Sequence, residues 1–320
     1  MADITIEPRQ ATGLSFFLSL VTGRLQPGKL WFDREYRMKY LFRSLAYPIT
    51  TWKLVNAIAT EPVLREILPV QHSLPSKIHR PYLYGGMPVS ARAQAILDHY
   101  NFAKNLPFPR LRQGMLTRQG VTLAAFRGKN DEAFSVTLAC SGRCEREGEV
   151  NLAITCNGVQ LATLTFAVMQ VKGEHVVTIG GIQGAHRDTP HEAIRDATKA
   201  CHGLFPKRLL METLSLFCQA TGIRQIRAVS DNGHIFRSFR YRFKKKSLFH
   251  ASYNEFWETL NARPLSPKLY ALPVIFPRKP LEDIASKKRA EARRRYELLD
   301  NMATCFAEQT GPAPEQTATS

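Results

Sequence analysis

The sequence is short of negative charge. Its 320 residues include 27 Asp and Glu against 44 Lys and Arg, so the formal net charge is +17. Such a surface favours polyanionic partners, which include anionic lipid head groups, nucleic acid and acidic proteins. It also fits a protein whose positive face is simply solvated. Hydrophobic residues make up 44% of the chain, which is enough for a sizeable core and excludes wholesale disorder.

Long apolar runs are also missing. The mostly apolar stretch from Leu14 to Val21 has eight residues, whereas a membrane-spanning helix needs about 20. Acidic Asp3 and Glu7 precede it and no small-residue cleavage site follows, so the stretch resembles a buried helix more than a signal peptide. We therefore expect a cytoplasmic protein without a transmembrane segment, whose membrane contact, if there is any, is peripheral at the inner membrane.

The six cysteines lack the paired spacing of a metal site. Only Cys140 and Cys144 stand close together, and no second pair of ligands follows them. Structural zinc sites need four ligands, usually as two such pairs. We therefore expect no metal and no cofactor. Scattered thiols suit a reducing compartment, where Cys201 and Cys218 act as small hydrophobic residues.

The order of the elements predicts an α/β (α+β) fold. Residues 1–108 have the pattern of a helical N-terminal region. Alternating apolar residues at 134–140, 149–156 and 159–171 then predict an antiparallel meander, with Asn157-Gly158 as a two-residue hairpin turn. A further strand at 175–182 precedes a helix that begins at Pro206 and ends at Gly222.

The strand predicted at 223–229 completes a crossover. A strand, a helix and a second strand in one sheet give a parallel, right-handed pair. Residues 109–300 are thus expected to form a mixed sheet, an antiparallel meander plus one parallel crossover strand, with C-terminal helices. This is the plan of GNAT-like acyltransferases, although an order of elements carries no function by itself. Residues 301–320 are predicted to be a disordered tail.

The loop that binds CoA in GNAT enzymes is absent. Its pattern, Gln/Arg-x-x-Gly-x-Gly/Ala, would precede the crossover helix, where the sequence has His202-Gly203-Leu204-Phe205-Pro206. At the end of the preceding strand, Gly180, Gly181 and Gly184 surround Gln183, which predicts either a loop that admits a ligand or a site of tight packing. Usual CoA binding is therefore not expected.

Basic residues offer candidate anion contacts. Lys207 and Arg208 begin the Pro206 helix, where they oppose the helix dipole unless an anion binds there. Between residues 224 and 295 there are 18 basic and 6 acidic residues, a net charge of +12. Alternation from Phe239 to Lys244 predicts a strand with one cationic face for phosphate, lipid head groups or an acidic carrier protein. The predicted ligand-binding residues are Gln183, Gly184, Lys207, Arg208, Arg237, Arg240 and Arg242.

Three histidines stand near carboxylates along the chain. A histidine beside a carboxylate is the minimal acid–base pair, because its charge changes near neutral pH. The candidate catalytic residues are the bases His186, His202 and His234, with Asp188 or Asp231 as the orienting carboxylate. For each of these histidines, the competing interpretation is a loop residue that makes only structural hydrogen bonds. His99, within a predicted helix, is interpreted as a core histidine.

Several short segments occur together in a family-like order. They are Gly180–Gly184, His202–Lys207, Ser230–His234, Tyr253–Trp257 and Ser286–Tyr296. In this combination the chain resembles the VirK/YbjX family of proteobacteria. The resemblance implies a link to virulence, envelope integrity and resistance to cationic antimicrobial peptides, without known catalytic residues. The predicted core also resembles the toxin-activating lysine acyltransferases, which are GNAT-like, lack the usual CoA loop and take acyl groups from acyl carrier protein.

Three functional hypotheses fit these features. The first is a GNAT-like acyltransferase that uses an acidic acyl donor, such as an acyl carrier protein, and one of the three histidines as base. The second is a non-enzymatic accessory protein that binds anionic lipid or a secretion partner. The third is a nucleic-acid-binding protein of a stress response, which is the least favoured because no helix-turn-helix, RNP or zinc-finger pattern is present. Donor, acceptor and oligomeric state stay open.

Overall fold

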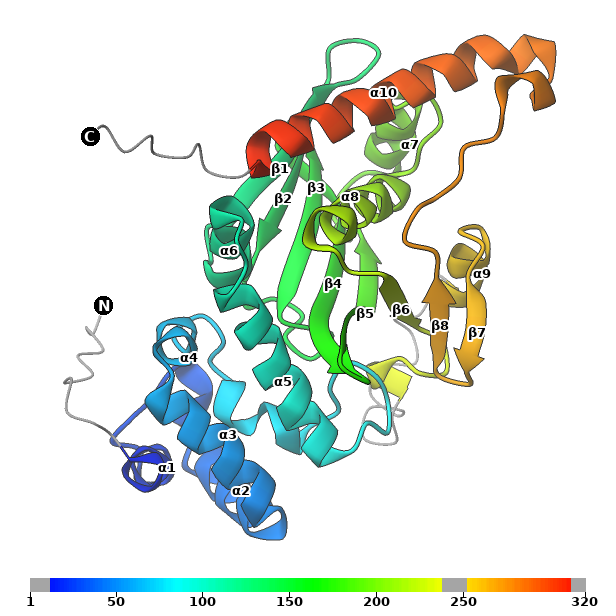
Figure 1. The fold of residues 1–320 in the computed structure, drawn as a ribbon. Coiled ribbons are helices and arrows are strands. Elements are labelled where there is room, and N and C mark those ends of the chain that lie inside the picture. Colours follow the sequence, from blue (N-terminus) through cyan, green and yellow to red (C-terminus); the bar gives the residue numbers. More distant parts are fainter. Residues whose placement is uncertain (1–11, 238–251, 312–320) are drawn as a thin grey trace, which may run out of the picture.

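The computed structural model describes residues 12–237 and 252–311. They contain an eight-stranded sheet with the order β1-β2-β3-β4-β5-β6-β8-β7 (Figure 1). The strands are β1 (Val121–Arg127), β2 (Ala133–Ala139), β3 (Val150–Cys156), β4 (Val159–Val171), β5 (Glu174–Gly184), β6 (Gln225–Val229), β7 (Arg263–Ser266) and β8 (Leu269–Leu272).

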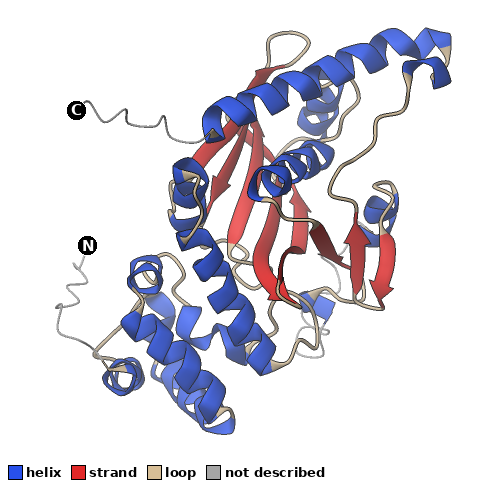
Figure 2. Cartoon of the chain, viewed as in Figure 1, coloured by secondary structure: helices blue, strands red, loops and turns tan. Residues whose placement is uncertain are grey.

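Helices surround this sheet and extend beyond it (Figure 2). In the described ranges they are α1 (Gly13–Thr22), α2 (Arg34–Ala46), α3 (Pro48–Thr60), α4 (Pro62–Ile67), α5 (Val89–Lys104), α6 (Pro109–Leu116), α7 (His191–Ala200), α8 (Pro206–Thr221), α9 (Tyr253–Glu258) and α10 (Ser286–Thr310), with 3-10 turns η1 (Lys29–Trp31), η2 (Leu74–His79), η3 (Ile235–Arg237) and η5 (Leu281–Asp283). Helices α5, α6, α8 and α10 pack on the sheet, whereas α1 to α4 form a separate group at its side.

The predicted mixed α/β plan is confirmed. Strands β1 to β5 pair antiparallel in sequence order, and β5 pairs in parallel with β6 across α7 and α8. The Asn157-Gly158 turn has both residues at positive φ, 48° and 80°, as a two-residue hairpin requires. Strand β1 and the β7–β8 hairpin were not predicted from the sequence. The strand predicted at Phe239–Lys244 lies outside the described residues.

The crossover helix α8 has the predicted ends. Pro206 occupies its first turn and Gly222 ends it in the left-handed conformation at φ 72°. Its buried stripe, which includes Leu210, Leu214 and Phe217, packs on β3 and β4. At the β1 edge of the sheet, α10 packs on β1 and continues to Thr310, so the predicted boundary at residue 300 falls inside this helix. Its buried residues include Leu298, Met302 and Phe306.

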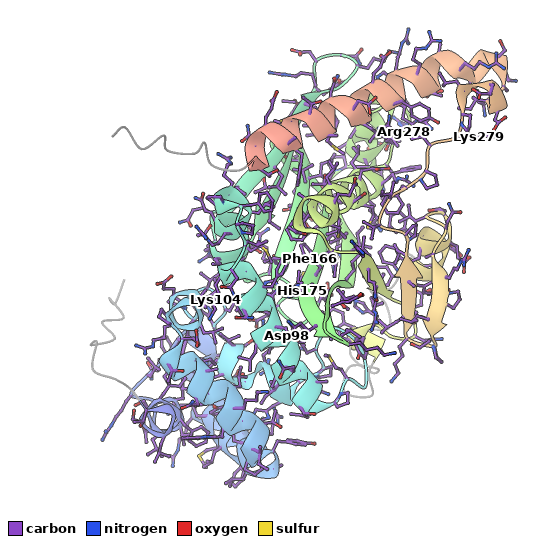
Figure 3. The ribbon with its side chains drawn as sticks, viewed as in Figure 1. Asp98, Lys104, Phe166, His175, Arg278 and Lys279 are labelled. Atoms are coloured by element: carbon purple, nitrogen blue, oxygen red, sulfur yellow. The ribbon has the colours of Figure 1, made fainter. Side chains whose placement is uncertain are left out.

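Polar contacts tie the helices to the sheet. The backbone N–H of Gln170 at the end of β4 donates to the Asp98 carboxylate on α5 at 2.9 Å. Figure 3 labels Asp98 and also His175, which pairs with Gln170 across the sheet. Arg278 pairs with Asp300 of α10 at 2.7 Å.

Within the described ranges, none of the helices combines the length and the apolar character that a bilayer crossing requires.

A buried ion pair joins the N-terminal helices to the sheet. The Nζ of Lys77, in η2, lies 2.9 Å from both carboxylate oxygens of Glu149, the residue before β3. Both side chains are almost completely buried. The hydroxyls of Tyr82 and Tyr100 donate to the same carboxylate at 2.6 and 2.7 Å. Burial and the Glu149 charge raise the pKa of both tyrosines well above its usual value, so both stay protonated as donors.

Gln71 completes this network. Its side-chain oxygen accepts from Lys77 at 3.0 Å, and its amide donates to the Glu149 carbonyl at 3.0 Å and to Cys140 Sγ at 3.3 Å. A charge taken out of water is tolerated only when it is paired and its remaining hydrogen-bonding capacity is used. The network meets that requirement with residues from four separate parts of the chain.

We predict that Lys77→Met lowers the free energy of unfolding by about 3–5 kcal/mol, because it leaves the Glu149 carboxylate buried and unpaired. Urea denaturation at neutral pH measures the loss. The control is Lys104→Met, which removes an exposed ion pair to Glu61 of the same 2.9 Å length and should cost about 1 kcal/mol or less. Equal costs for the two variants would contradict the assignment of Lys77–Glu149 as the stabilising contact.

His99 on α5 is a core residue, as interpreted from the sequence, but only half of its hydrogen-bonding capacity is used. Its Nδ1 accepts from the Val168 N–H at 3.1 Å, and within the described residues its buried Nε2 has no partner. Burial first, and then the charge of Lys77, lower its pKa to about 3. Burial, with Arg43 and Arg92, lowers the pKa of His79 to about 4.

These two histidines make the fold sensitive to acid. The unfolded chain protonates them near pH 6.5 and the folded chain does so only at about 3 and 4. Between these pH values the unfolded state therefore binds more protons than the folded state. The stability that the two histidines contribute is complete above pH 6.5. It falls as the pH drops, by about 1.4 kcal/mol per pH unit for each histidine.

We expect His99→Asn to remove about 2 kcal/mol of the stability lost between pH 7 and pH 5. Asparagine keeps an acceptor for the Val168 N–H but does not titrate. Urea denaturation at the two pH values measures the difference. The exposed His186→Asn serves as the control and should leave the pH dependence unchanged. An unaltered acid sensitivity in His99→Asn would show that the folded protein takes up the His99 proton at the same pH as the unfolded chain.

Candidate functional site

The parallel strands β5 and β6 separate at one point. Their pairing runs from Val176–Gln225 to Ile179–Ala228 and stops there. Strand β5 continues to Gly184, whereas β6 ends at Val229 and the chain turns away. At the same point Gly180 has no partner on β4, because the register shifts between Thr165 and Phe166. Ligands of open α/β sheets bind in such a crevice, at the carboxyl ends of strands that diverge.

Four side chains from distant segments meet beside this divergence. Glu147 precedes β3, Gln183 lies on β5, His234 follows β6 and Tyr253 begins α9. We call them the Glu147 cluster. Glu147 Oε1 lies 3.3 Å from His234 Nε2, and the Gln183 amide donates to Glu147 Oε2. The Glu147 and His234 side chains are each 2% exposed.

Tyr253 covers the other side of His234. Their ring centroids lie 5.3 Å apart, and the Tyr253 hydroxyl accepts from the Ile182 N–H of β5 at 3.4 Å. Burial first, and then the charge of Glu147, raise the pKa of Tyr253 above its ordinary value. His234 Nδ1 accepts from the Phe236 N–H at 3.4 Å. The Nε2 thus faces the carboxylate, which orients the ring and would stabilise it when it takes up a proton.

The glycines of β5 are explained by packing against Glu147. A Cβ at Gly180 would overlap the Glu147 backbone, and one at Gly181 would overlap its carboxylate. A Cβ at Gly148 would likewise overlap the backbone of Phe166. The sequence allowed two interpretations of this glycine-rich strand end, a loop that admits a ligand and a site of tight packing. Tight packing is the one that applies to Gly180 and Gly181. Gly184, by contrast, is exposed and nothing lies within 4 Å of a Cβ built there.

Asp231 contacts the start of α9. Its carboxylate accepts from the Tyr253 N–H at 2.8 Å and from the Ser252 hydroxyl at 2.9 Å. Its own N–H donates to the Asn254 side chain at 2.9 Å. One turn later the Trp257 indole donates to the Val229 carbonyl at 2.8 Å. Asp231 thereby positions Tyr253, and it is Glu147 that faces His234.

The other two predicted histidines have different surroundings. His186 Nδ1 lies 3.1 Å from Asp188, but these side chains are 79% and 89% exposed. His202 forms the turn between α7 and α8 at φ 53°, and its carbonyl accepts from Arg295 of α10 at 2.9 Å. Partial burial and the charge of Arg294 lower the pKa of His202. Gln183 and His234 are thus the predicted residues that one carboxylate brings together.

The predicted anion contacts are divided between two regions. At the start of α8, Arg208 pairs with Glu212 at 2.7 Å and lies 4.7 Å from the centre of the Phe276 ring. Burial lowers the pKa of neighbouring Lys207. Arg240 and Arg242 lie outside the described residues, as does the side chain of Arg237, although its backbone ends η3.

The six cysteines are free, and Cys201 and Cys218 are buried as predicted. Among the residues that the structure describes, no three His, Cys, Asp or Glu side chains gather as a metal ion would require.

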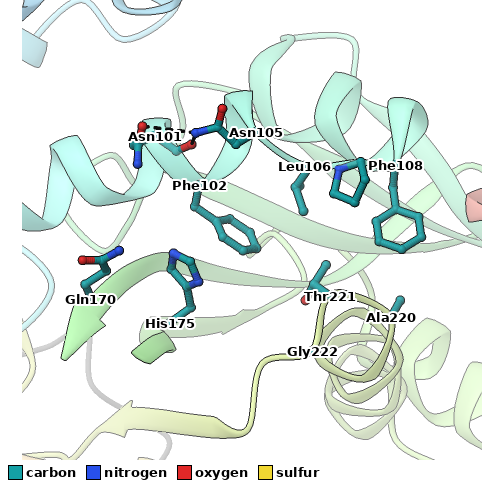
Figure 4. Close-up of a pocket in the computed structure, with 11 residues that line it drawn as sticks. Asn101, Phe102, Asn105, Leu106, Phe108, Gln170, His175, Ala220, Thr221 and Gly222 are labelled. Atoms are coloured by element: carbon teal, nitrogen blue, oxygen red, sulfur yellow. Dashed lines mark hydrogen bonds between the residues drawn. The ribbon is translucent and has the colours of Figure 1, made fainter. Parts of the chain in front are cut away.

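A cavity of about 530 Å³ opens at the opposite end of β5. The His175 and Phe102 rings, 4.9 Å apart, form one wall (Figure 4). The lining residues are Asn101, Phe102, Asn105, Leu106, Pro107, Phe108, Gln170, His175, Ala220, Thr221 and Gly222. None of them is an Asp, Glu, Lys or Arg residue, so the cavity suits a small, mostly apolar molecule.

Sequence reasoning missed Glu147, the central residue of the cluster. Nothing in its local sequence distinguishes it from the neighbouring Glu145 and Glu149. Tyr253 was noticed only as part of a family-like segment. The signal that pointed to this place was the pair of adjacent glycines on a strand, because glycine there indicates the close approach of another group.

Known proteins resemble this chain over most of its length. A family model described as "Protein of unknown function (DUF535)" matches residues 29–308. The "Uncharacterized protein YbjX" of Escherichia coli strain K12 is 40% identical over 312 residues, which are 96% of this chain and 94% of that protein. An "Uncharacterized protein" of Haemophilus influenzae is 26% identical over 276 residues, 84% of this chain and 87% of its own length.

We predict that Gly181→Ala lowers the free energy of unfolding by about 1–3 kcal/mol, because its methyl group displaces the Glu147 carboxylate. Gly184→Ala, three residues along the same strand, should change it by about 0.5 kcal/mol or less. Urea denaturation of both variants measures the contrast. A Gly181→Ala variant as stable as Gly184→Ala would mean that Glu147 does not occupy this position.

Proposed function

The chain belongs to the DUF535 family together with Escherichia coli YbjX, and on that premise we propose that it is a GNAT-like acyltransferase with His234 as its base. The observation that supports this is the buried His234–Glu147 pair, 3.3 Å between nitrogen and oxygen, at the divergence of the two parallel strands. A histidine held by a carboxylate takes up a proton from an attacking nucleophile and later returns it.

The reaction transfers an acyl group from a thioester. The acceptor, an amine or a hydroxyl, loses its proton to His234 Nδ1 as it attacks the thioester carbonyl. There the proton replaces the 3.4 Å contact from the Phe236 N–H, while Nε2 keeps facing Glu147. The carbon–sulfur bond then breaks, and the protonated imidazole returns the proton to the departing thiolate. Glu147 stabilises the imidazolium between these steps, and Gln183 holds the second carboxylate oxygen. The products are an acylated acceptor and a free thiol, so no additional reactant is needed.

Positive charge favours an acidic carrier protein as the donor. The CoA loop is absent from the sequence before α8. A crossover helix runs antiparallel to its strands, so the start of α8 lies toward the same end of the strands as the Glu147 cluster, on the other face of the sheet. The Arg295 contact to His202 brings the basic half of α10 beside the start of α8. Lys287, Lys288, Arg289, Arg293 and Arg294 are exposed there. Such a surface attracts an acidic partner.

The role in the cell follows from the same proposal. An acyltransferase with lipid-like or protein acceptors would modify envelope components, which accounts for the expected link to virulence, envelope integrity and resistance to cationic peptides. The second candidate, a non-enzymatic accessory protein that binds anionic lipid, is favoured by an exposed apolar surface on α2 and α3. Nucleic-acid binding stays the third hypothesis, and it rests on the net charge of +17.

We predict that His234→Ala slows acyl transfer from an acyl carrier protein thioester by about 10²- to 10⁴-fold. Release of the carrier thiol, with a short amine or hydroxyl acceptor, measures the rate. Glu147→Gln should slow transfer less, because the imidazole stays in place. His186→Ala, in an exposed pair with Asp188, is the matched control and should transfer at the wild-type rate.

Thermal unfolding of each variant separates lost chemistry from lost structure. A folded His234→Ala protein that transfers acyl groups as fast as the wild type would exclude His234 as the base. No thiol release by the wild-type protein, with any acyl chain length on the carrier, would exclude the acyltransferase itself.

A further inference from the structure

The corner between α2 and α3 exposes a group of large apolar side chains. They are Met38, Phe42, Leu45, Tyr47, Ile49 and Trp52, and their exposed fractions range from 36% for Met38 to 84% for Ile49. We call them the corner patch. Met38, Phe42 and Leu45 follow one another at helical spacing and so share a face of α2, as Ile49 and Trp52 share a face of α3. Tyr47 connects the two faces at the end of α2.

The same two helices are firmly attached to the core through their other faces. Tyr40 of α2 is buried, with its ring 5.1 Å from that of Trp31 and 5.4 Å from that of Phe17. Leu54 and Ile58 of α3 are completely buried. The corner patch is therefore a surface presented by a packed fold, and not an apolar stripe that lacks its place in the core.

Exposed apolar residues are concentrated in this part of the molecule. Of the 14 large hydrophobic residues that are exposed within the described ranges, ten lie between Leu14 and Trp52. The other four, Val159, Phe205, Leu265 and Ile275, are scattered over other elements. Such a concentration of exposed apolar residues marks a site of interaction with a protein or a membrane.

The charge around the patch distinguishes these partners. Residues 29–53 contain six basic and two acidic residues, a net charge of +4. Lys39 and Lys53, which flank the patch, are exposed. Surfaces that lie in the headgroup layer of an anionic bilayer typically combine Trp, Tyr and Phe with Lys and Arg. Because that layer is fluid, it receives the tip of a protruding corner without a groove of matching shape.

We propose that the corner patch docks this protein on the surface of an anionic phospholipid bilayer. The apolar side chains enter the headgroup layer while the basic residues around them contact the phosphates. The helical group that carries the patch lies at one end of the molecule and the basic beginning of α10 at the other (Figure 1). Membrane contact thus comes from the N-terminal helices, and not from the basic C-terminal section where the charge predicted it.

This inference does not depend on the acyltransferase proposal. Docking needs neither His234 nor an acyl donor, so His234→Ala should bind vesicles as the wild type does. A protein that binds vesicles but transfers no acyl group would leave the docking surface in place and exclude the enzyme. A protein that transfers acyl groups but does not bind vesicles would exclude the docking surface and leave the enzyme in place.

Tryptophan fluorescence can report on the patch directly. The chain has three tryptophans; Trp31 and Trp257 are completely buried, and Trp52 in the patch is 51% exposed. With vesicles of phosphatidylcholine and phosphatidylglycerol at low salt, we expect the emission of Trp52 to shift to the blue. Lipids brominated on their acyl chains should quench it. Pure phosphatidylcholine and high salt should weaken the effect, because the basic residues then contribute little.

Matched variants test whether the patch is the contact. Phe42→Ser with Ile49→Ser should weaken vesicle binding about tenfold or more, since two large apolar groups no longer enter the bilayer. Phe205→Ser with Ile275→Ser is the control, because Phe205 is 64% exposed like Phe42 and Ile275 is 64% exposed. Binding of the control should be unchanged. Exposed substitutions of this kind leave folding intact, which thermal unfolding checks.

Three results would overturn the proposal. No change in Trp52 emission with any vesicle at low salt would exclude docking. A blue shift that grows with protein concentration in the absence of lipid would assign the patch to contact with a second copy of the chain. Vesicle binding that survives in the patch variant but is lost in Arg293→Glu with Arg294→Glu would place the lipid contact on α10.

Discussion

The buried Lys77–Glu149 pair is the contact on which the arrangement of this molecule depends. It is a buried, charged point at which the N-terminal helices meet the sheet, and the partners are 72 residues apart in the chain. Because an unpaired charge in the interior is so costly, η2, α5 and the start of β3 can adopt few other arrangements. Tyr82, Tyr100 and Gln71 use up the remaining hydrogen-bonding capacity of the pair.

The same segment carries the candidate site. Glu147 stands two residues before Glu149, and Gly148 between them allows the chain to pass against the backbone of Phe166. One carboxylate is thereby neutralised by Lys77 while the other contacts Gln183 and His234. A segment anchored so firmly on one side can hold a histidine in a single orientation on the other, which is what acid–base chemistry requires.

Two different surfaces, one basic and one apolar, serve the proposed roles. Basic residues collect along the first half of α10, near the turn that begins α8. Apolar residues collect at the corner of α2 and α3. An acidic donor protein and an anionic bilayer would both be attracted by the overall charge, but the bilayer also takes up the bulky apolar groups of the corner patch. If both proposals hold, this division leaves the other end of a docked protein free for a soluble partner.

The sequence by itself determined the features that local chemistry controls. Pro206 and Gly222 delimit α8, Asn157-Gly158 sets a hairpin turn, and the order of strands and helices gives the mixed sheet with one parallel pair. Tertiary structure alone decided which of three nearby glutamates face the interior, that His234 and not His186 has a buried carboxylate, and that Gly181 leaves room for it. The reason is physical: turns and helix ends depend on neighbours in the chain, whereas the burial of a charge depends on partners that only folding brings near.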